Sequence, residues 1–138
     1  MDALNKPKVL LVEDDSFLSS LLRLKLEKSN YEVTHAADGQ QALDILVNLK
    51  PDLILLDLIL PKKNGFEVLE AIRQNPLTEK LPVIIISNLG QESDVTRGKS
   101  LGIIDYFIKA KLSIDDLVLK VSETLKQMSV PIPPLNTS

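Results

Sequence analysis

Cysteine is absent from the 138 residues, so neither disulfides nor thiolate metal ligands are available. Excess positive charge is absent too: the formal net charge of −3 argues against a nucleic-acid-binding surface, which is usually basic. The start of the chain, MDALNKPK, lacks the apolar core of a signal peptide, and no apolar run reaches the length of a membrane span. These absences predict a monomeric cytoplasmic module with no membrane contact.

The apolar residues that are present form short bursts typical of strands. Three runs, 9–12, 53–56 and 83–86, are continuously apolar and bounded by charge or proline, which predicts strands buried on both faces of a parallel sheet. Residues 31–35 alternate apolar with polar side chains, and residues 104–108 are only partly apolar. We therefore expect the first three runs to be central strands and the last two to be edge strands.

Helical periodicity fills the segments between these strands. Apolar residues recur at helical spacing in all but one of them, for example at Ala42, Ile45, Leu46 and Leu49. Asp38-Gly39 and Asn64-Gly65 mark the starts of the second and third helices. Helices between successive parallel strands predict an α/β fold, an open (βα)5 parallel sheet with helices on both faces. The strand order 2-1-3-4-5 is assigned by its match to doubly wound folds such as flavodoxin.

Two segments depart from this regular pattern. The fourth helix, about residues 91–101, has Val95 as its only large interior apolar residue, and Gly98 costs it about 1 kcal/mol against alanine. It is either a weak surface helix or a segment kept near low stability because it moves. Residues 129–138 are rich in proline and are expected to form a tail or linker after a domain spanning residues 7–128.

Polar residues gather where the predicted strands end. The first strand runs into Glu13, Asp14 and Asp15, the third into Asp57, the fourth into Ser87-Asn88 and the fifth into Lys109. Ligands of open α/β sheets bind at this carboxyl edge. Two carboxylates about 4 Å apart repel by ~4 kcal/mol at an effective dielectric near 20. A divalent cation relieves that repulsion, and all-oxygen ligands favour Mg²⁺ or Mn²⁺ over zinc.

A metal-bound carboxylate beside a lysine and a hydroxyl suits phosphoryl transfer. Asp57 is the best candidate nucleophile, because an apolar strand delivers it alone to the centre of the edge. A single acid at a strand end is more often a helix cap or a solvated turn, and for Asp15 we favour a cap of the first helix. Lys109 taken alone is more often a surface ammonium. The convergence of four strand ends favours a site.

Four motifs make the resemblance to a known family explicit: LLVEDD at 10–15, DLILLDLILPKKNGFEVLEAIR at 52–73, VIIISN at 83–88 and DYFIKAK at 105–111. In this order and spacing they resemble the receiver (CheY-like) domains of two-component response regulators. The resemblance implies that Asp57 is the phosphoacceptor and that the metal ligands are Glu13, Asp14, Asp57 and the backbone carbonyl of Ile59. It further implies that Ser87 and Lys109 contact the phosphoryl group and that Tyr106 is a switch aromatic.

Three residues depart from the family pattern. Ser87 replaces a more frequent threonine and keeps its hydroxyl. Asn88 stands where the family usually has a small residue, which affects access to Asp57 and the lifetime of the phosphoryl bond. Ala110 stands where the family usually has proline after a cis peptide. Because a cis bond before alanine costs about 2.5–4 kcal/mol, we predict a trans Lys109–Ala110 bond.

The resemblance implies a signalling switch rather than an enzyme acting on a separate substrate. A histidine kinase or phosphotransfer protein would phosphorylate Asp57 in a magnesium-dependent step and thereby change an output face of helix four, strand five and helix five. His35, the only histidine, is expected to be a plain surface residue, so the phosphodonor is another protein. A monomer or a phosphorylation-dependent dimer is expected.

Two rival functions stay open. A receiver-like interaction module that needs no phosphate is supported by Asn88 and Ala110, whereas the intact Asp14, Asp57 and Lys109 count against it. A phosphatase or nucleotide-binding enzyme is disfavoured, since no second aspartate follows Asp57 by two residues and no glycine-rich phosphate loop follows a strand.

Overall fold

Five strands alternate with five helices in the computed structural model, which describes residues 5–129. The elements, in chain order, are β1 (Lys8–Val12), α1 (Ser16–Lys28), β2 (Glu32–Ala36), α2 (Gly39–Leu46), β3 (Leu53–Leu56), α3 (Gly65–Gln74), β4 (Val83–Ser87), α4 (Glu92–Ser100), β5 (Asp105–Ile108), the 3₁₀ turn η2 (Lys109–Lys111) and α5 (Ile114–Ser129). All but the first residue of the expected proline-rich tail lies outside the described residues. Within residues 5–129, no helix combines the length and apolar character needed to span a membrane.

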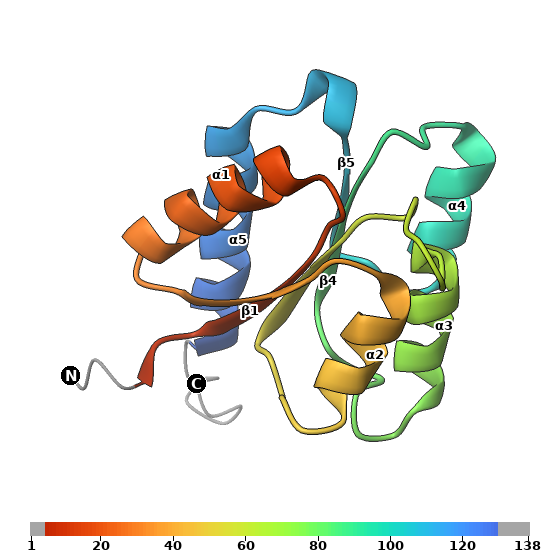
Figure 1. Ribbon diagram of the computed structural model, residues 1–138, viewed down its shortest axis with the longest axis horizontal. Helices are drawn as coiled ribbons and strands as arrows, with labels where there is room; N and C mark the ends of the chain where they lie inside the picture. Colours follow the sequence, from red (N-terminus) through yellow and green to blue (C-terminus); the bar gives the residue numbers. More distant parts are fainter. Residues whose placement is uncertain (1–4, 130–138) are drawn as a thin grey trace, which may run out of the picture.

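The strands form one parallel sheet in the order β2-β1-β3-β4-β5, which confirms the predicted fold and order. Helices α1 and α5 cover one face of the sheet, and α2, α3 and α4 cover the other (Figure 1). Because every strand is parallel, all five carboxyl ends meet at the same edge. The sheet thereby brings together residues that lie far apart in the sequence.

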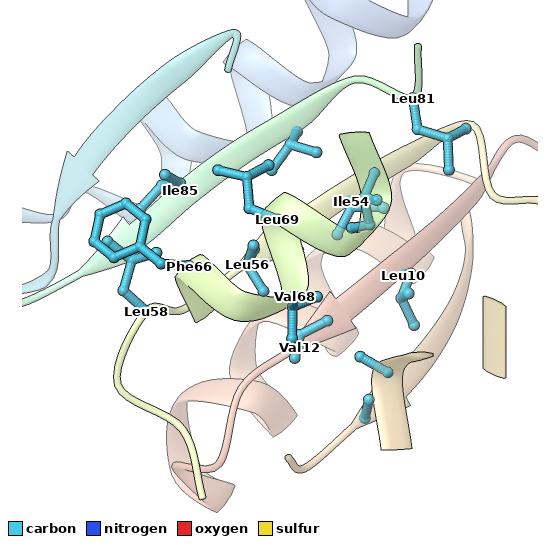
Figure 2. Close-up of a cluster of buried hydrophobic side chains, with 14 residues drawn as sticks. Leu10, Val12, Ile54, Leu56, Leu58, Phe66, Val68, Leu69, Leu81 and Ile85 are labelled. Carbon is cyan, nitrogen blue, oxygen red and sulfur yellow. The ribbon is translucent and has the colours of Figure 1, made fainter. Parts of the chain in front are cut away.

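Alternating side chains of the central strands supply two separate cores. One core lies under α2 and α3 and contains Leu10, Val12, Ile54, Leu56 and Ile85 from the sheet (Figure 2). The residues between them face the opposite core under α1 and α5, which includes Leu22, Leu26, Leu117 and Val121 from these helices. Each fully buried Leu or Ile stabilises the fold by about 1.5–3 kcal/mol relative to exposure. Burial on both faces explains why these strands are continuously apolar.

Side-chain caps begin three of the helices at the residues that the sequence indicated. Asp15 accepts from the Leu18 N–H at the start of α1, so it is a cap. Asp38 caps α2 in the same way. Asn64 and Glu67 form a reciprocal capping box at the start of α3. The caps satisfy backbone N–H groups that have no partner inside the helix, and they fix where the loops above the sheet end.

Helix α4 is attached by polar contacts and one close approach instead of an apolar face. Gly98 is its only buried residue. A Cβ at this position would lie 2.9 Å from the Cδ1 atom of Ile103, so the glycine permits tight packing that the sequence analysis did not anticipate. Arg97 lies 4.1 Å from the centre of the Phe66 ring and forms a 2.8 Å ion pair with Glu70. These contacts tie α4 to α3.

Replacing Arg73 should destabilise the fold, because its guanidinium connects α3 to two other segments of backbone, 79–81 and 101–102. It donates to the carbonyl oxygens of Leu101 (2.7 Å), Leu81 (2.7 Å), Glu79 (3.0 Å) and Gly102 (3.3 Å). Hydrogen bonds to charged groups contribute roughly 1.5–3 kcal/mol each, but losses within one network are not additive. We expect Arg73→Ala to lower the free energy of unfolding in urea by about 2 kcal/mol.

Arg23→Ala is the matched control for this measurement. Arg23 is exposed, and among residues 5–129 its one ion pair is with Glu27 on the same helix, at 3.1 Å. Such a pair contributes about 0.3–0.5 kcal/mol. Equal losses in the two variants would contradict a special role for the Arg73 network.

Candidate functional site at the carboxyl edge of the sheet

Three carboxylates meet where β1 and β3 end. Glu13 is fully buried, Asp57 is 1% exposed, and Asp14 is exposed. One carboxylate oxygen from each residue lies within 4.8 Å of the others. The backbone holds this arrangement in place, because the Asp57 N–H donates to the Val12 carbonyl and the Glu13 N–H donates to the Ala36 carbonyl, both at 3.0 Å. The predicted acidic cluster therefore exists as one site.

Lys109 reaches this cluster from the end of β5. Its Nζ lies 2.7 Å from Asp57 Oδ2 and 2.8 Å from Glu13 Oε1, and it donates to Glu13 Oε2 at 2.9 Å. Burial lowers the pKa of Lys109, but the hydrogen bonds and charges of Asp57 and Glu13 outweigh it and raise the pKa overall. For Glu13, burial is the largest influence and raises the pKa of its carboxyl. The ammonium is thus held charged between two carboxylates.

The donor set at this edge fits a divalent cation. Three carboxylates and one ammonium leave two negative charges uncompensated. Glu13 Oε1 lies close to Lys109 Nζ, yet it is buried and accepts no hydrogen bond from the described residues. All the ligand atoms are oxygens, which suits Mg²⁺ or Mn²⁺. The Ile59 N–H donates to Asp57 Oδ1 at 3.1 Å, which places the Ile59 backbone beside the cluster; its carbonyl as a ligand stays a prediction.

Ser87 and Asn88 follow one another at the end of β4, between β3 and β5. Ser87 is fully buried, and its Oγ accepts from the Leu89 N–H at 3.2 Å. Within residues 5–129, Ser87 makes no hydrogen bond to Asp57. Asn88 Oδ1 accepts from the Ala110 N–H at 3.0 Å. No peptide bond in the described residues is cis, which confirms the predicted trans Lys109–Ala110 bond.

His35 corrects one expectation from the sequence. It is half-buried, not a plain surface residue, and its Nε2 lies 2.7 Å from the Glu13 carbonyl oxygen. Because a carbonyl oxygen can only accept, Nε2 carries the proton and donates. The register of the sheet explains this contact, since His35 pairs with Leu11 and lies beside the end of β1. No local sequence motif predicts the contact between His35 and the Glu13 carbonyl, because this contact depends on the pairing of β1 with β2.

Tyr106 lies on β5 with its hydroxyl donating to the Leu89 carbonyl oxygen. Burial, together with the charges of Asp94 and Asp57, raises the pKa of Tyr106 to about 12 from the ordinary value of 10.0. The ring packs against the core under α3. Tyr106 therefore connects the loop after Ser87 to strand β5, and its role as a switch stays a prediction.

Replacing Tyr106 by phenylalanine should change how stability depends on pH. The folded state keeps the phenol proton up to about pH 12, whereas the unfolded chain loses it near pH 10.0. The contribution of the protonated Tyr106 phenol to the free energy of unfolding is therefore complete below pH 10 and is lost as the pH rises toward 12. We expect the free energy of unfolding to fall more steeply over this interval in the unmodified chain than in Tyr106→Phe, measured by urea unfolding. Parallel curves would contradict the raised pKa.

Gly65 was expected to mark a helix start, but its lack of a side chain also leaves room for the backbone of Asp57 and Leu58. A Cβ there would lie 2.2 Å from the Asp57 carbonyl oxygen and 2.5 Å from the Leu58 Cα, both backbone atoms. We expect Gly65→Ala to destabilise the fold by about 1–3 kcal/mol and to displace Asp57. Gly90→Ala is the control, because the nearest atom to its Cβ would be the end of the Ile108 side chain, at 3.0 Å, and the nearest backbone atom, the Asn88 carbonyl oxygen, lies at an ordinary 3.9 Å. Urea unfolding distinguishes them; equal effects would show that the close approach at Gly65 is unimportant.

The sheet order and the carboxylate–lysine cluster define the CheY-like class of signalling domains. A family model, the response regulator receiver domain, matches residues 9–122, and the chain belongs to this family. The transcriptional regulatory protein CpxR of Escherichia coli (strain K12) is 42% identical over 120 residues, covering 87% of this chain and 50% of CpxR. The chain spans about half the length of the curated relatives it matches.

Solved structures agree with this assignment. The Francisella response regulator 1452 receiver domain aligns with a TM-score of 0.82 and 31% identity, covering 90% of this chain and 100% of that one. The Mn²⁺-bound form of response regulator Rcp1 aligns with a TM-score of 0.75 and 33% identity, covering 93% and 99%. Receiver domains are signalling switches rather than conventional enzymes, and they interact with histidine kinases and output domains.

Proposed function

We propose that this domain accepts a phosphoryl group on Asp57 from a histidine kinase or phosphotransfer protein. The observation that carries the proposal is the 2.7 Å contact between Lys109 Nζ and Asp57 Oδ2 inside a cluster of three carboxylates. A nearly buried aspartate with a fixed ammonium beside it and uncompensated negative charge around it suits phosphoryl transfer, where positioning and charge stabilisation dominate.

In the proposed reaction, a carboxylate oxygen of Asp57 forms a bond to phosphorus while the bond from phosphorus to the donor's histidine nitrogen breaks. The Ile59 N–H holds Asp57 Oδ1 and so restricts rotation of the carboxylate. Lys109 offsets the negative charge of the incoming phosphoryl oxygens, and the Ser87 hydroxyl provides a donor at the neighbouring strand end. A Mg²⁺ ion held by Glu13, Asp14, Asp57 and the Ile59 carbonyl would neutralise further charge on these oxygens.

The proposed output face consists of α4, β5 and α5. Tyr106 links β5 to the loop before α4, so a change at Ser87 can reach this face through Leu89. Leu119 of α5 and Ile104, which directly precedes β5, are exposed apolar side chains. We propose a protein partner or a second copy of this domain for it, no direct nucleic-acid contact by residues 5–129, and cytoplasmic action.

Labelling of the unmodified chain tests the proposal. Incubation with acetyl phosphate and Mg²⁺ should add the mass of one phosphoryl group, in a form that acid and hydroxylamine remove as expected for an acyl phosphate. Chelation of the divalent cation should prevent the addition. No mass increase with acetyl phosphate or with a phosphorylated histidine donor would exclude the proposed function.

A phosphate-independent interaction module is the second candidate. Asn88 and Ala110 favour it, because both depart from the usual receiver pattern and because they are hydrogen-bonded to each other beside the site. The same labelling experiment separates the candidates, since a module that needs no phosphate would gain no phosphoryl mass from acetyl phosphate.

A further inference from the structure

The loop after Ser87 and the turn after Lys109 are joined by one side-chain hydrogen bond. Asn88 Oδ1 accepts from the Ala110 N–H at 3.0 Å. Asn88 directly follows a residue of the candidate site, and so does Ala110. The bond therefore connects the backbone that carries Ser87 to the backbone that carries Lys109. We call this hydrogen bond, between Asn88 and Ala110, the 88–110 bridge.

The 88–110 bridge requires two of the three residues that depart from the family pattern, Asn88 and Ala110. An alanine at position 88 would offer no side-chain acceptor, and a proline at position 110 would have no N–H to donate. The two departures thus form one matched pair rather than two separate defects. The trans peptide before Ala110 leaves its N–H pointing at Asn88.

The bridge acts on Lys109 through the peptide unit that follows it. Fixing the Ala110 nitrogen fixes the plane of the Lys109–Ala110 peptide and so limits the direction in which the lysine side chain leaves the backbone. Lys109 must reach two carboxylates at once, with Nζ 2.7 Å from Asp57 Oδ2 and 2.9 Å from Glu13 Oε2. A rigid starting point is valuable for such a long, flexible side chain.

The loop at the other end of the bridge is itself held. The Leu89 N–H donates to Ser87 Oγ at 3.2 Å, and the Leu89 carbonyl accepts from the Tyr106 hydroxyl. These two contacts of Leu89 restrict the backbone next to Asn88, so the Asn88 side chain is well placed to hold the Ala110 N–H.

We propose that Asn88 is a positioning residue that holds Lys109 against Asp57 through the Ala110 N–H. The bridge replaces the constraint that a proline would supply at position 110. Its effect on the placement of Lys109 is independent of phosphorylation, whereas its effect on the rate of phosphorylation rests on the proposed function. Because both residues are solvent-exposed, we expect effects of about 3- to 10-fold, the range for one hydrogen bond.

The test uses the full chain with the variants Asn88→Ala, Asn88→Asp, Ala110→Pro and the double variant Asn88→Ala/Ala110→Pro. Asn88→Ala should speed hydrogen exchange of the Ala110 amide and broaden the isotope-labelled ammonium resonance of Lys109. It should lower the maximal rate of labelling by acetyl phosphate by about 3- to 10-fold and leave the half-saturating acetyl phosphate concentration unchanged. Asn88→Asp keeps an acceptor oxygen and should restore slow exchange at Ala110.

The Ala110→Pro background separates positioning from access to the site. The donor is absent there, so adding Asn88→Ala should change the labelling rate no further. An equal effect of Asn88→Ala in both backgrounds, or faster labelling of Asn88→Ala, would show that Asn88 controls access and would overturn the proposal. So would unchanged exchange of the Ala110 amide in Asn88→Ala. If the unmodified chain takes no label, the proposed function fails, while the exchange and ammonium measurements still decide whether the bridge positions Lys109.

Discussion

Asp57→Asn should reduce phosphoryl incorporation from acetyl phosphate to background. The amide that replaces the carboxylate keeps its shape and its acceptor oxygen but loses the negative charge that makes the oxygen nucleophilic. The shape matters because Asp57 is 1% exposed and accepts from the Ile59 N–H, so an isosteric replacement disturbs the fold least. Mass spectrometry of the intact chain after incubation measures the result directly.

Asp52→Asn is the matched control. Asp52 precedes the same strand, β3, but lies at the opposite end of it, where its Oδ2 accepts from the Lys8 N–H at 2.7 Å. This variant should incorporate as much phosphoryl group as the unmodified chain. Equal labelling of Asp57→Asn and the unmodified chain would assign the acceptor to another residue and remove the basis of the proposed function.

The sequence predicted the layers of the fold because burial imposes a simple pattern on it. Strands β1, β3 and β4 are apolar at every position of their interior, and both cores use them in alternation. Helix caps such as Asp38 and Asn64 contact backbone only three residues away, so the local sequence predicted their positions too. Strand order was a different matter, since it was assigned by likeness to known folds rather than derived from these residues.

The candidate site was predictable to the extent that it depends on strand ends. The parallel sheet places Glu13, Asp57 and Lys109 at one edge through its backbone topology alone, independent of side-chain conformation. The contacts between side chains were not predictable, because they depend on reach across strands that are distant in the sequence. The bond of His35 to the Glu13 carbonyl and the bond of Asn88 to the Ala110 N–H are of this kind.

Gly65 shows the same limit for the backbone. The Asn64-Gly65 pair signalled a helix start, and the helix begins there. Nothing in the local sequence shows that the Asp57 carbonyl lies so close that a Cβ cannot fit. A motif thus indicates the position of a turn, whereas the reason for its glycine lies in the tertiary packing.

Lys109→Met should destabilise the fold by about 3–5 kcal/mol at neutral pH without divalent cations, as expected when one partner of a buried ion pair is removed. Methionine retains most of the length and apolar volume of lysine but leaves Glu13 and Asp57 without their ammonium. Their side chains are 0% and 2% exposed, so water cannot replace it. Urea unfolding in the presence of a chelator measures the loss.

The pH and the cation should both change the size of this loss. The pKa of Glu13 is already raised by burial, and removing the ammonium of Lys109 raises it further. A raised folded-state pKa means that stability is lost as the pH rises, so the deficit of Lys109→Met should shrink at lower pH.

Mg²⁺ should stabilise the Lys109→Met variant more than the unmodified chain, because the folded variant has one more uncompensated negative charge for the cation to bind. Lys111→Met, in the same turn but exposed, should change none of these quantities, and equal deficits in the two variants would contradict the buried pair.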